Sequence, residues 1–353
     1  MPHLKTLFAI STLLLSSLAC ATLLGERANT DGNSASIQVP PGLGASPDAQ
    51  PPIASVEAAS CPVITEQIVG ANTNLDLSNN VAEDFNSTSD DDDELIYLVT
   101  YQIDGDQITD PYFEKVPASL KDEQDDLAAH QQIWDYYKSL IPAAYRSTLR
   151  EFSIMTDGQE NLLAAVWQTT DDPALWGMEV DIADADDYYY FSFTLIHEFA
   201  HLLTLGPDQV PPNMDVYNNP DDDDIYVRAA DACPNFFTGE GCSKADSYMN
   251  AFYNQFWTGI YAEWDEINLI DDEDARDEAL DDFYYKYEDQ FLTDYSATHP
   301  AEDIAEAFGF FIFATQPDGD TIAEQKILFF YQYPELVQLR QEILANLCVN
   351  FPE

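Results

Sequence analysis

The most constraining stretch of this chain is FTLIHEFAHLLTLG, residues 193–206. It is apolar enough for a buried helix, yet it carries His197, Glu198 and His201. Residues four positions apart lie on one face of a helix, so the two histidines point the same way, one turn apart. Burying polar side chains costs free energy unless a partner satisfies them. The stretch therefore predicts a buried helix whose histidines bind one metal ion.

The spacing of these residues is the His-Glu-x-x-His motif of zinc hydrolases. In that motif zinc held by two histidines acidifies water, and the adjacent glutamate, here Glu198, takes the proton. The alternative is a core helix with two incidental histidines that ordinary hydrogen bonds satisfy. The chain has only five histidines and the rest of the helix is apolar, which favours the zinc interpretation. A catalytic zinc ion usually has three protein ligands, so the motif is one ligand short.

The best source of a third ligand is DYSATHPAEDIAEAF, residues 294–308. Pro300 suits the first position of a helix, with Thr298 or His299 as its cap. Glu302 and the glutamate four residues later then share one face of a largely apolar helix. Such a pair needs a partner, which zinc and its histidines supply, so Glu302 is the predicted third ligand. Three neighbouring residues remain alternatives: Asp303, Glu306 and His299.

Both segments resemble the gluzincin metallopeptidases, and most closely the anthrax lethal-factor type. That type pairs His-Glu-Phe-x-His with a later Tyr and Glu-x-x-Ala-Glu-Ala-Phe; the matching pieces here are HEFAH and YSATHPAEDIAEAF. The resemblance implies that Glu302 is the third zinc ligand and that Glu306 orients a ligand histidine. It also implies that Tyr295 donates a hydrogen bond to the oxyanion of the tetrahedral intermediate. About a hundred residues separate His201 from Glu302, more than in lethal factor, which leaves substrate preference open.

The order of the predicted elements favours an α+β fold, which the resemblance makes zincin-like: a small mixed sheet with an edge strand plus several helices. Strands are predicted at residues 94–103, 151–156, 162–169 and 176–183. Helices are predicted at 119–141, 188–205, 247–267, 275–291, 300–315 and 320–347. Strand 176–183 precedes the metal helix and is predicted to be the edge strand, along which an extended peptide can pair. Its Glu179 then either contacts substrate or faces solvent.

The N-terminal region predicts export. In residues 1–20 a lysine precedes the apolar stretch LFAISTLLLSSLAC, which is too short to span a membrane and is typical of a signal peptide. The stretch ends at Cys20, where it resembles a bacterial lipoprotein processing site with a lipidated cysteine; ordinary cleavage and secretion is the alternative. Residues 21–60 are rich in Pro, Ser and Ala and predict a flexible tether. Residues 61–353 are then the catalytic domain, with an acidic insert at about 207–290.

Cysteine parity supports this view. Without Cys20, four of the five cysteines remain, an even number that predicts two disulfides in an exported chain. Three pairings are possible. We favour Cys233 with Cys242, which closes a short loop, and Cys61 with Cys348, which ties the two ends of the domain together.

The charge balance excludes one class of partner. The chain has 65 acidic against 13 basic residues and a net charge of -52, which argues against nucleic acid. Such a surface attracts basic peptides and cations. The sequence thus predicts an exported zinc metallopeptidase with a peptide or protein substrate, basic peptides included. The alternatives are a non-catalytic zinc-binding surface protein and a calcium-dependent adhesion module based on the runs Asp90–Glu94 and Asp221–Asp224. Oligomeric state is left open.

Overall fold

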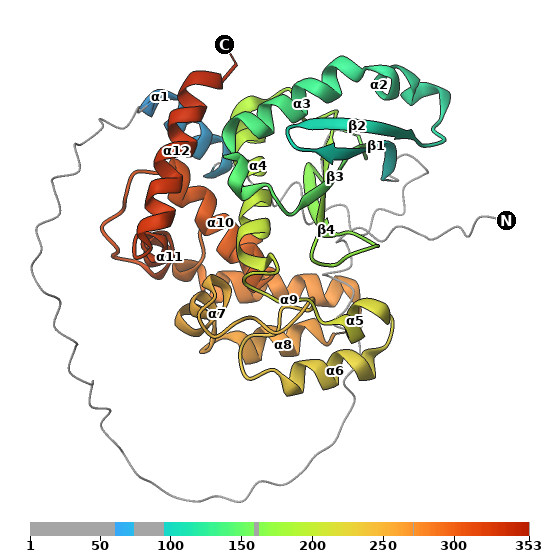
Figure 1. Cartoon of the computed structure of the whole chain (residues 1–353). Helices are drawn as coiled ribbons and strands as arrows, with labels where there is room; N and C mark the ends of the chain where they lie inside the picture. The colour runs from blue at the N-terminus through green and yellow to red at the C-terminus, as the bar shows by residue number, and fades with distance from the viewer. Residues whose placement is uncertain (1–60, 74–94, 159–161, 271, 353) are drawn as a thin grey trace, which may run out of the picture.

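The computed structural model describes residues 61–73, 95–158, 162–270 and 272–352. The predicted signal peptide, the tether, Cys20 and the acidic run Asp90–Glu94 lie outside these residues. Figure 1 shows helix α4 in the middle of the molecule, between the strands and helices α10 to α12, with α5 to α9 grouped at one end of α4.

Five strands form one mixed sheet in the order β2-β1-β3-β5-β4. Their bounds are β1 (Ile96–Asp104), β2 (Gln107–Phe113), β3 (Leu149–Thr156), β4 (Ala164–Gln168) and β5 (Trp176–Asp181). β3 and β5 are parallel, whereas every other neighbouring pair is antiparallel. This sheet and its helices confirm the α+β prediction. β2 was not predicted from the sequence, because it contains Pro111. The strand lies at the sheet edge, where one side needs no hydrogen-bond partner, so a proline is tolerated there.

The predicted strand 176–183 is present as β5, but the prediction that it is the edge strand was wrong. β5 lies inside the sheet, between β3 and β4, and β4 is the edge strand. The turn between β4 and β5 returns the chain antiparallel, so β4 adds to the free side of β5. Glu179 of β5 is fully buried, so the expectation of a solvent-facing side chain was also wrong.

The two faces of the sheet have different chemistry. One face carries Phe152 and Ile154 of β3 with Met178 of β5, and it packs towards α3 (Leu127–Leu140), where Trp134 contacts the Phe152 ring. The other face is polar, because alternate residues of a strand point to opposite sides. There the Thr100 and Ser153 hydroxyls are 2.9 Å apart.

Helix α4 (Tyr188–Leu205) has the predicted bounds, and the Asp187 carboxylate caps it by accepting from the amides of Tyr189 and Tyr190. It packs against α10 (Pro300–Phe313), with Phe193 between the rings of Phe310 and Phe313. A Cβ atom at Gly309 would lie only 2.7 Å from the Phe193 ring, so glycine permits this close approach. The two predicted metal-binding segments are therefore neighbours.

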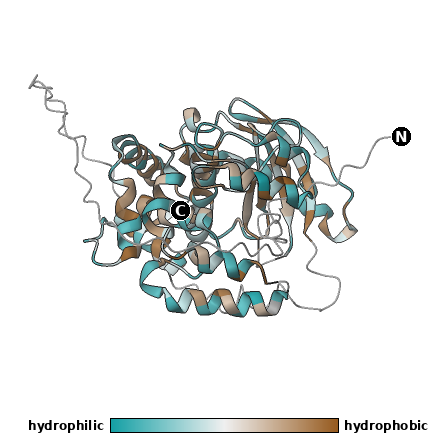
Figure 2. Cartoon of the chain, turned by 90° about the horizontal axis from the view of Figure 1, so that it is seen from below, coloured by the Kyte–Doolittle hydropathy of each residue, from teal (hydrophilic) through white to brown (hydrophobic). Residues whose placement is uncertain are grey.

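Of the remaining helices, α1, α5 and α6 were not predicted, and the others are shorter than the helices predicted in their places. Their bounds are α1 (Pro62–Thr73), α2 (Lys121–Asp125), α5 (Met214–Asn218), α6 (Asp223–Ala232), α7 (Tyr248–Phe252), α8 (Tyr261–Asn268), α9 (Glu273–Lys286), α11 (Ile322–Phe330) and α12 (Pro334–Asn350). The predicted helix 119–141 divides at Asp126, which caps α3, and the last helix divides before Pro334. In Figure 2 hydrophobic residues gather in the interior and the peripheral helices carry many hydrophilic ones.

Both favoured disulfides are present. Cys61 is bonded to Cys348 and Cys233 to Cys242, which confirms the predicted pairing. Two disulfides indicate an oxidising environment of the kind that exported proteins meet. Among the described residues, no helix has the length and apolar character needed to cross a membrane.

Candidate metal centre

Helix α4 places three polar side chains in the core. His197, Glu198 and His201 are all buried, at 6%, 7% and 7% exposure. One ligand atom from each lies within 4.8 Å of the others, so this group could hold a metal ion. The predicted geometry of the motif, with both imidazoles on one side of the helix, is therefore present.

Helix α10 brings Glu302 to the same point. Its Oε2 atom lies 3.0 Å from His197 Nε2 and 3.3 Å from His201 Nε2. The two Nε2 atoms are 3.1 Å apart. Ligands about 2.0–2.1 Å from a tetrahedral zinc ion are separated by about 3.3 Å. The three atoms thus have nearly the mutual spacing that one zinc ion would require.

Glu306 and Thr293 support one of these histidines. The Nδ1 atom of His197 is 2.9 Å from Glu306 Oε1, and the Thr293 hydroxyl donates to Glu306 Oε2 at 2.9 Å. A carboxylate in this position accepts a hydrogen bond from the Nδ1–H group and leaves the Nε2 lone pair free for a metal. The geometry is therefore that expected for a ligand histidine held by a carboxylate.

The electrostatics of the cluster favour charged partners. Burial alone would lower the pKa of His197, but its hydrogen bonds to the carboxylates of Glu302 and Glu306 outweigh burial and raise the pKa well above its usual value. Burial would likewise raise the pKa of Glu302, yet His201 and His197 hold that pKa well below its ordinary range. Glu302 is therefore an anion, the form in which a carboxylate binds a metal.

Glu198 differs from Glu302 in its pKa, because at Glu198 burial outweighs the charges of the two histidines. Burial is the main cause that raises its pKa to about 7, against the opposing effect of the two histidines. A carboxyl group with a pKa near neutrality can both accept and return a proton at physiological pH. This property suits the predicted general base.

Tyr295 lies in a short 3-10 turn, Tyr295–Ala297, just before α10. Tyr295 as a whole residue is 38% exposed, and its ring centroid is 5.8 Å from that of His197. Burial of the hydroxyl, followed by the charges of Glu302 and Glu198, raises the pKa of Tyr295 well above its usual value. The phenol is thus a permanent hydrogen-bond donor beside the cluster.

Two of the alternative third ligands point elsewhere. His299 caps α10, its Nδ1 atom accepting from the Ala301 amide at 3.0 Å, as one sequence alternative proposed. Asp303 is fully buried and forms an ion pair with Lys326 at 2.6 Å. Glu306 contacts His197 through Nδ1 rather than Nε2. Of the candidates, Glu302 therefore has the position that a third ligand needs.

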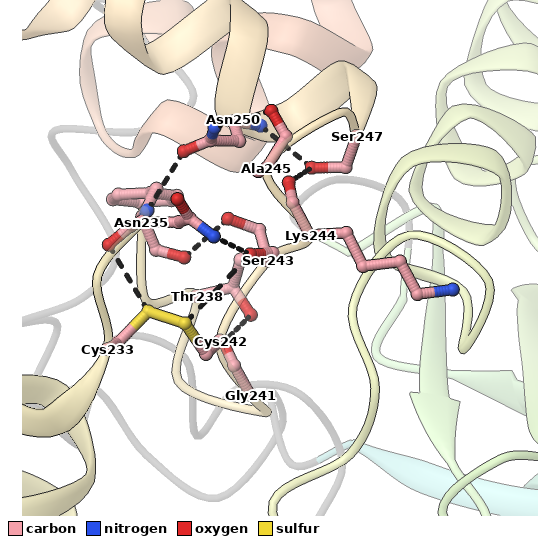
Figure 3. The surroundings of a disulfide bond; sticks show 11 residues. Cys233, Asn235, Thr238, Gly241, Cys242, Ser243, Lys244, Ala245, Ser247 and Asn250 are labelled. Atoms are coloured by element: carbon pink, nitrogen blue, oxygen red, sulfur yellow. Dashed lines mark hydrogen bonds between the residues drawn. A yellow bond between two sulfur atoms is a disulfide. The ribbon is translucent and has the colours of Figure 1, made fainter.

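Glu240 is a neighbour of the cluster that the sequence did not reveal. It lies in the loop closed by Cys233 and Cys242, whose internal hydrogen bonds Figure 3 shows. Its carboxylate accepts from the Thr238 hydroxyl at 2.6 Å, and its charge interacts with those of His201 and Glu302. From the sequence, only the spacing of Cys233 and Cys242 indicated a loop here. That spacing does not show that the loop folds back towards the cluster.

A second group of carboxylates lies where the parallel strands β3 and β5 end. Asp157, Asp181 and Asp184 have oxygen atoms within 4.8 Å of one another. Asp181 accepts from the amides of Asp157 and Ala183 and so holds the two strand ends together. Burial raises the pKa of Asp157 to about 7. We assign this group a role in joining the strands.

No family model, curated protein or solved structure matches the chain.

Proposed function

We propose that this chain is an exported zinc metallopeptidase of the gluzincin type, with a zincin-like catalytic domain in residues 61–353. One observation carries the proposal. Two imidazole nitrogens and a carboxylate oxygen, from His197, His201 and Glu302, approach one another within 3.0–3.3 Å in a buried site. Two nitrogens and one oxygen form a donor set found in catalytic zinc sites.

The protein residues around this point have complementary roles. A zinc ion held by His197, His201 and Glu302 would supply Lewis-acid activation of water and of the scissile carbonyl. Glu198 accepts the proton of the attacking water and returns it to the leaving amine. Tyr295 donates its hydroxyl hydrogen to the developing oxyanion. Glu306 keeps the imidazole of His197 in one orientation.

The sheet offers a place for the substrate. β4 is an edge strand with one unpaired side, and α4 packs beside it. An extended peptide can pair with such an edge through main-chain hydrogen bonds. The sequence predicted this role for β5. Because β5 lies inside the sheet, we assign the role to β4 instead. The net charge of -52 favours peptides that carry basic residues.

The proposal places the enzyme outside the cytoplasm. The two disulfides support export. A lipid on Cys20 would tether the enzyme to a membrane, and secretion of a cleaved form is the alternative. Intact-mass analysis of the exported protein distinguishes lipid on Cys20 from a free N-terminus further along the chain.

The central experiment combines metal analysis with peptide digestion. Glu198→Gln should keep one zinc ion per chain, because Glu198 is not a ligand, and should abolish chelator-sensitive hydrolysis of a peptide library. Glu302→Ala should lower the zinc content, because it removes a ligand. Glu66→Gln, an exposed change on α1, is the control and should alter neither property.

The outcomes separate the alternatives. Full activity of Glu198→Gln would refute the mechanism. Full zinc retention by Glu302→Ala would mean that the third ligand is Glu306, Asp303 or His299 instead. Stoichiometric zinc in the unaltered protein without hydrolysis of any peptide would support the non-catalytic zinc-binding alternative.

A further inference from the structure

A cavity lies on the polar face of the sheet, on the side opposite α3. Its volume is about 240 Å³, and strands β1, β2, β3 and β4 all contribute to its walls. A single water molecule occupies about 30 Å³ of liquid, so the cavity has room for a small organic molecule. None of the residues with a role in the proposed peptidase chemistry lines this cavity.

The walls carry negative charge. Asp110, Glu114 and Glu151 line the cavity, and none of the described lining residues is a lysine, arginine or histidine. The three carboxylates come from different parts of the sheet. Among the described residues, the groups close enough to share one metal ion do not include them. The arrangement therefore suits several separate positive charges better than one inorganic ion.

A buried carboxylate lies beneath the same face. Glu179 is paired in register with Ser153 and Ala165 on the neighbouring strands, so its side chain points to the side of the sheet that bears the cavity. It is fully buried, and neither of its oxygens has a hydrogen bond of good geometry from a described residue. The Tyr97 hydroxyl, which also lines the cavity, acts on it as a hydrogen-bond donor. A buried acid with no well-formed hydrogen bond calls for a functional or structural explanation.

Aromatic rings complete the walls. Tyr97, Tyr112 and Trp167 line the cavity beside the carboxylates. The face of an aromatic ring attracts an ammonium group, and the ring also packs against methylene groups. Alternating ammonium and methylene units would thus find both kinds of contact here.

We propose that this cavity binds a linear polyamine, whose ammonium groups pair with the wall carboxylates above Glu179 and whose methylene segments pack on the aromatic rings. The separation of the carboxylates favours a ligand with several charges over one with a single charge. This inference does not depend on the metal centre.

Calorimetric titration of the purified full chain with spermidine tests the proposal. At about 0.15 M salt the Debye length is about 8 Å, so attraction to the net charge of the chain is screened and saturable binding reports a site. We expect one spermidine per chain. Glu151→Gln and Glu114→Gln should each weaken binding by about tenfold or more, because each removes a negative charge from the wall of the cavity.

Three controls make the result decisive. Glu66→Gln removes the same charge from an exposed position on α1 and should leave binding unchanged. Asp110→Asn and Tyr112→Ala, both at exposed rim positions where a change is tolerated by the fold, should each weaken binding. Near-ultraviolet circular dichroism checks the fold of every variant.

Four outcomes would overturn the proposal. They are absence of saturable binding, equal weakening by Glu66→Gln, unchanged binding by the cavity variants, and binding of a peptide with one unmodified lysine in preference to spermidine. The last result would assign the cavity to a basic side chain of a peptide.

Discussion

Glu302 and Glu179 are both largely buried carboxyl groups, and their surroundings shift their pKa values in opposite directions. Two histidines face Glu302 and hold its pKa well below the usual value despite burial. Burial dominates at Glu179 and raises its pKa to about 7, with the charge of Glu198 acting in the same direction. Partner charge, rather than depth, thus decides which acid is ionised.

The raised pKa of Glu179 predicts a pH-dependent stability. The folded state binds this proton more tightly than the unfolded chain, whose pKa is about 4.5. The contribution of Glu179 to stability is therefore complete below pH 4.5 and is lost as the pH rises through about 7. Relative to Glu179→Gln, the unaltered protein should lose about 3 kcal/mol of unfolding free energy between pH 5 and pH 8.

Urea denaturation of both proteins at the two pH values measures this difference. The glutamine of the variant does not titrate, so its curve reports every other group in the chain. Parallel pH dependences of the two proteins would show that Glu179 is ionised in the folded state, contrary to the prediction.

The residues of the site differ in how far the sequence could predict them. His197, Glu198 and His201 follow from spacing along one helix, and Glu302 from the spacing within a second. Glu240 could not be predicted, because its position depends on how a disulfide loop folds back. The burial of Glu179 was missed because it depends on strand order in the sheet, which chain order does not fix.

At the scale of an element, α10 has two polar sides with different roles. Glu302 and Glu306 face α4, whereas Asp303 is turned by about 100° around the axis and faces α11. There it accepts from the Trp257 indole at 2.7 Å and pairs with Lys326. The pair links α11 to the helix that carries Glu302. It therefore helps to hold the predicted third ligand in place.

Lys326→Ala should destabilise the protein by about 3–5 kcal/mol, because it leaves Asp303 as a buried charge without its cation. Lys286→Ala is the matched control. Lys286 also forms a 2.6 Å ion pair, with Glu263, but both side chains are exposed, and such pairs contribute little. Urea denaturation at pH 7 compares the two. Similar small losses in both variants would mean that the buried pair does not stabilise α10.

The elements themselves were predictable to different degrees. The bounds of α4 and the start of α10 followed from apolar periodicity, a capping position and Pro300. The break at Asp126 was missed because the apolar pattern continues through it, although its side chain caps α3. β2 was missed because it contains Asp110 and Pro111, both unfavourable in strands, which an exposed edge strand tolerates.

At the scale of the whole molecule, the candidate metal centre depends on segments far apart in the chain. α4 and α10 meet in the core, and α1 packs against both. The disulfide from Cys61 to Cys348 spans 287 residues and joins α1 to α12. The second disulfide spans only nine residues and closes the loop that carries Glu240. The first bond thus constrains the domain and the second a single loop.

Replacing the Cys61–Cys348 pair by serines should lower the unfolding free energy by about 2–5 kcal/mol, because a long loop is released in the unfolded chain. The Cys233–Cys242 pair, replaced in the same way, should cause a smaller loss, because loop-closure entropy grows with loop length. Urea denaturation under non-reducing conditions measures both variants, and zinc content follows the site. If the short-loop variant lost as much stability as the long-loop variant, the disulfide loop at Glu240, rather than the junction of the domain ends, would be the main covalent support of the fold.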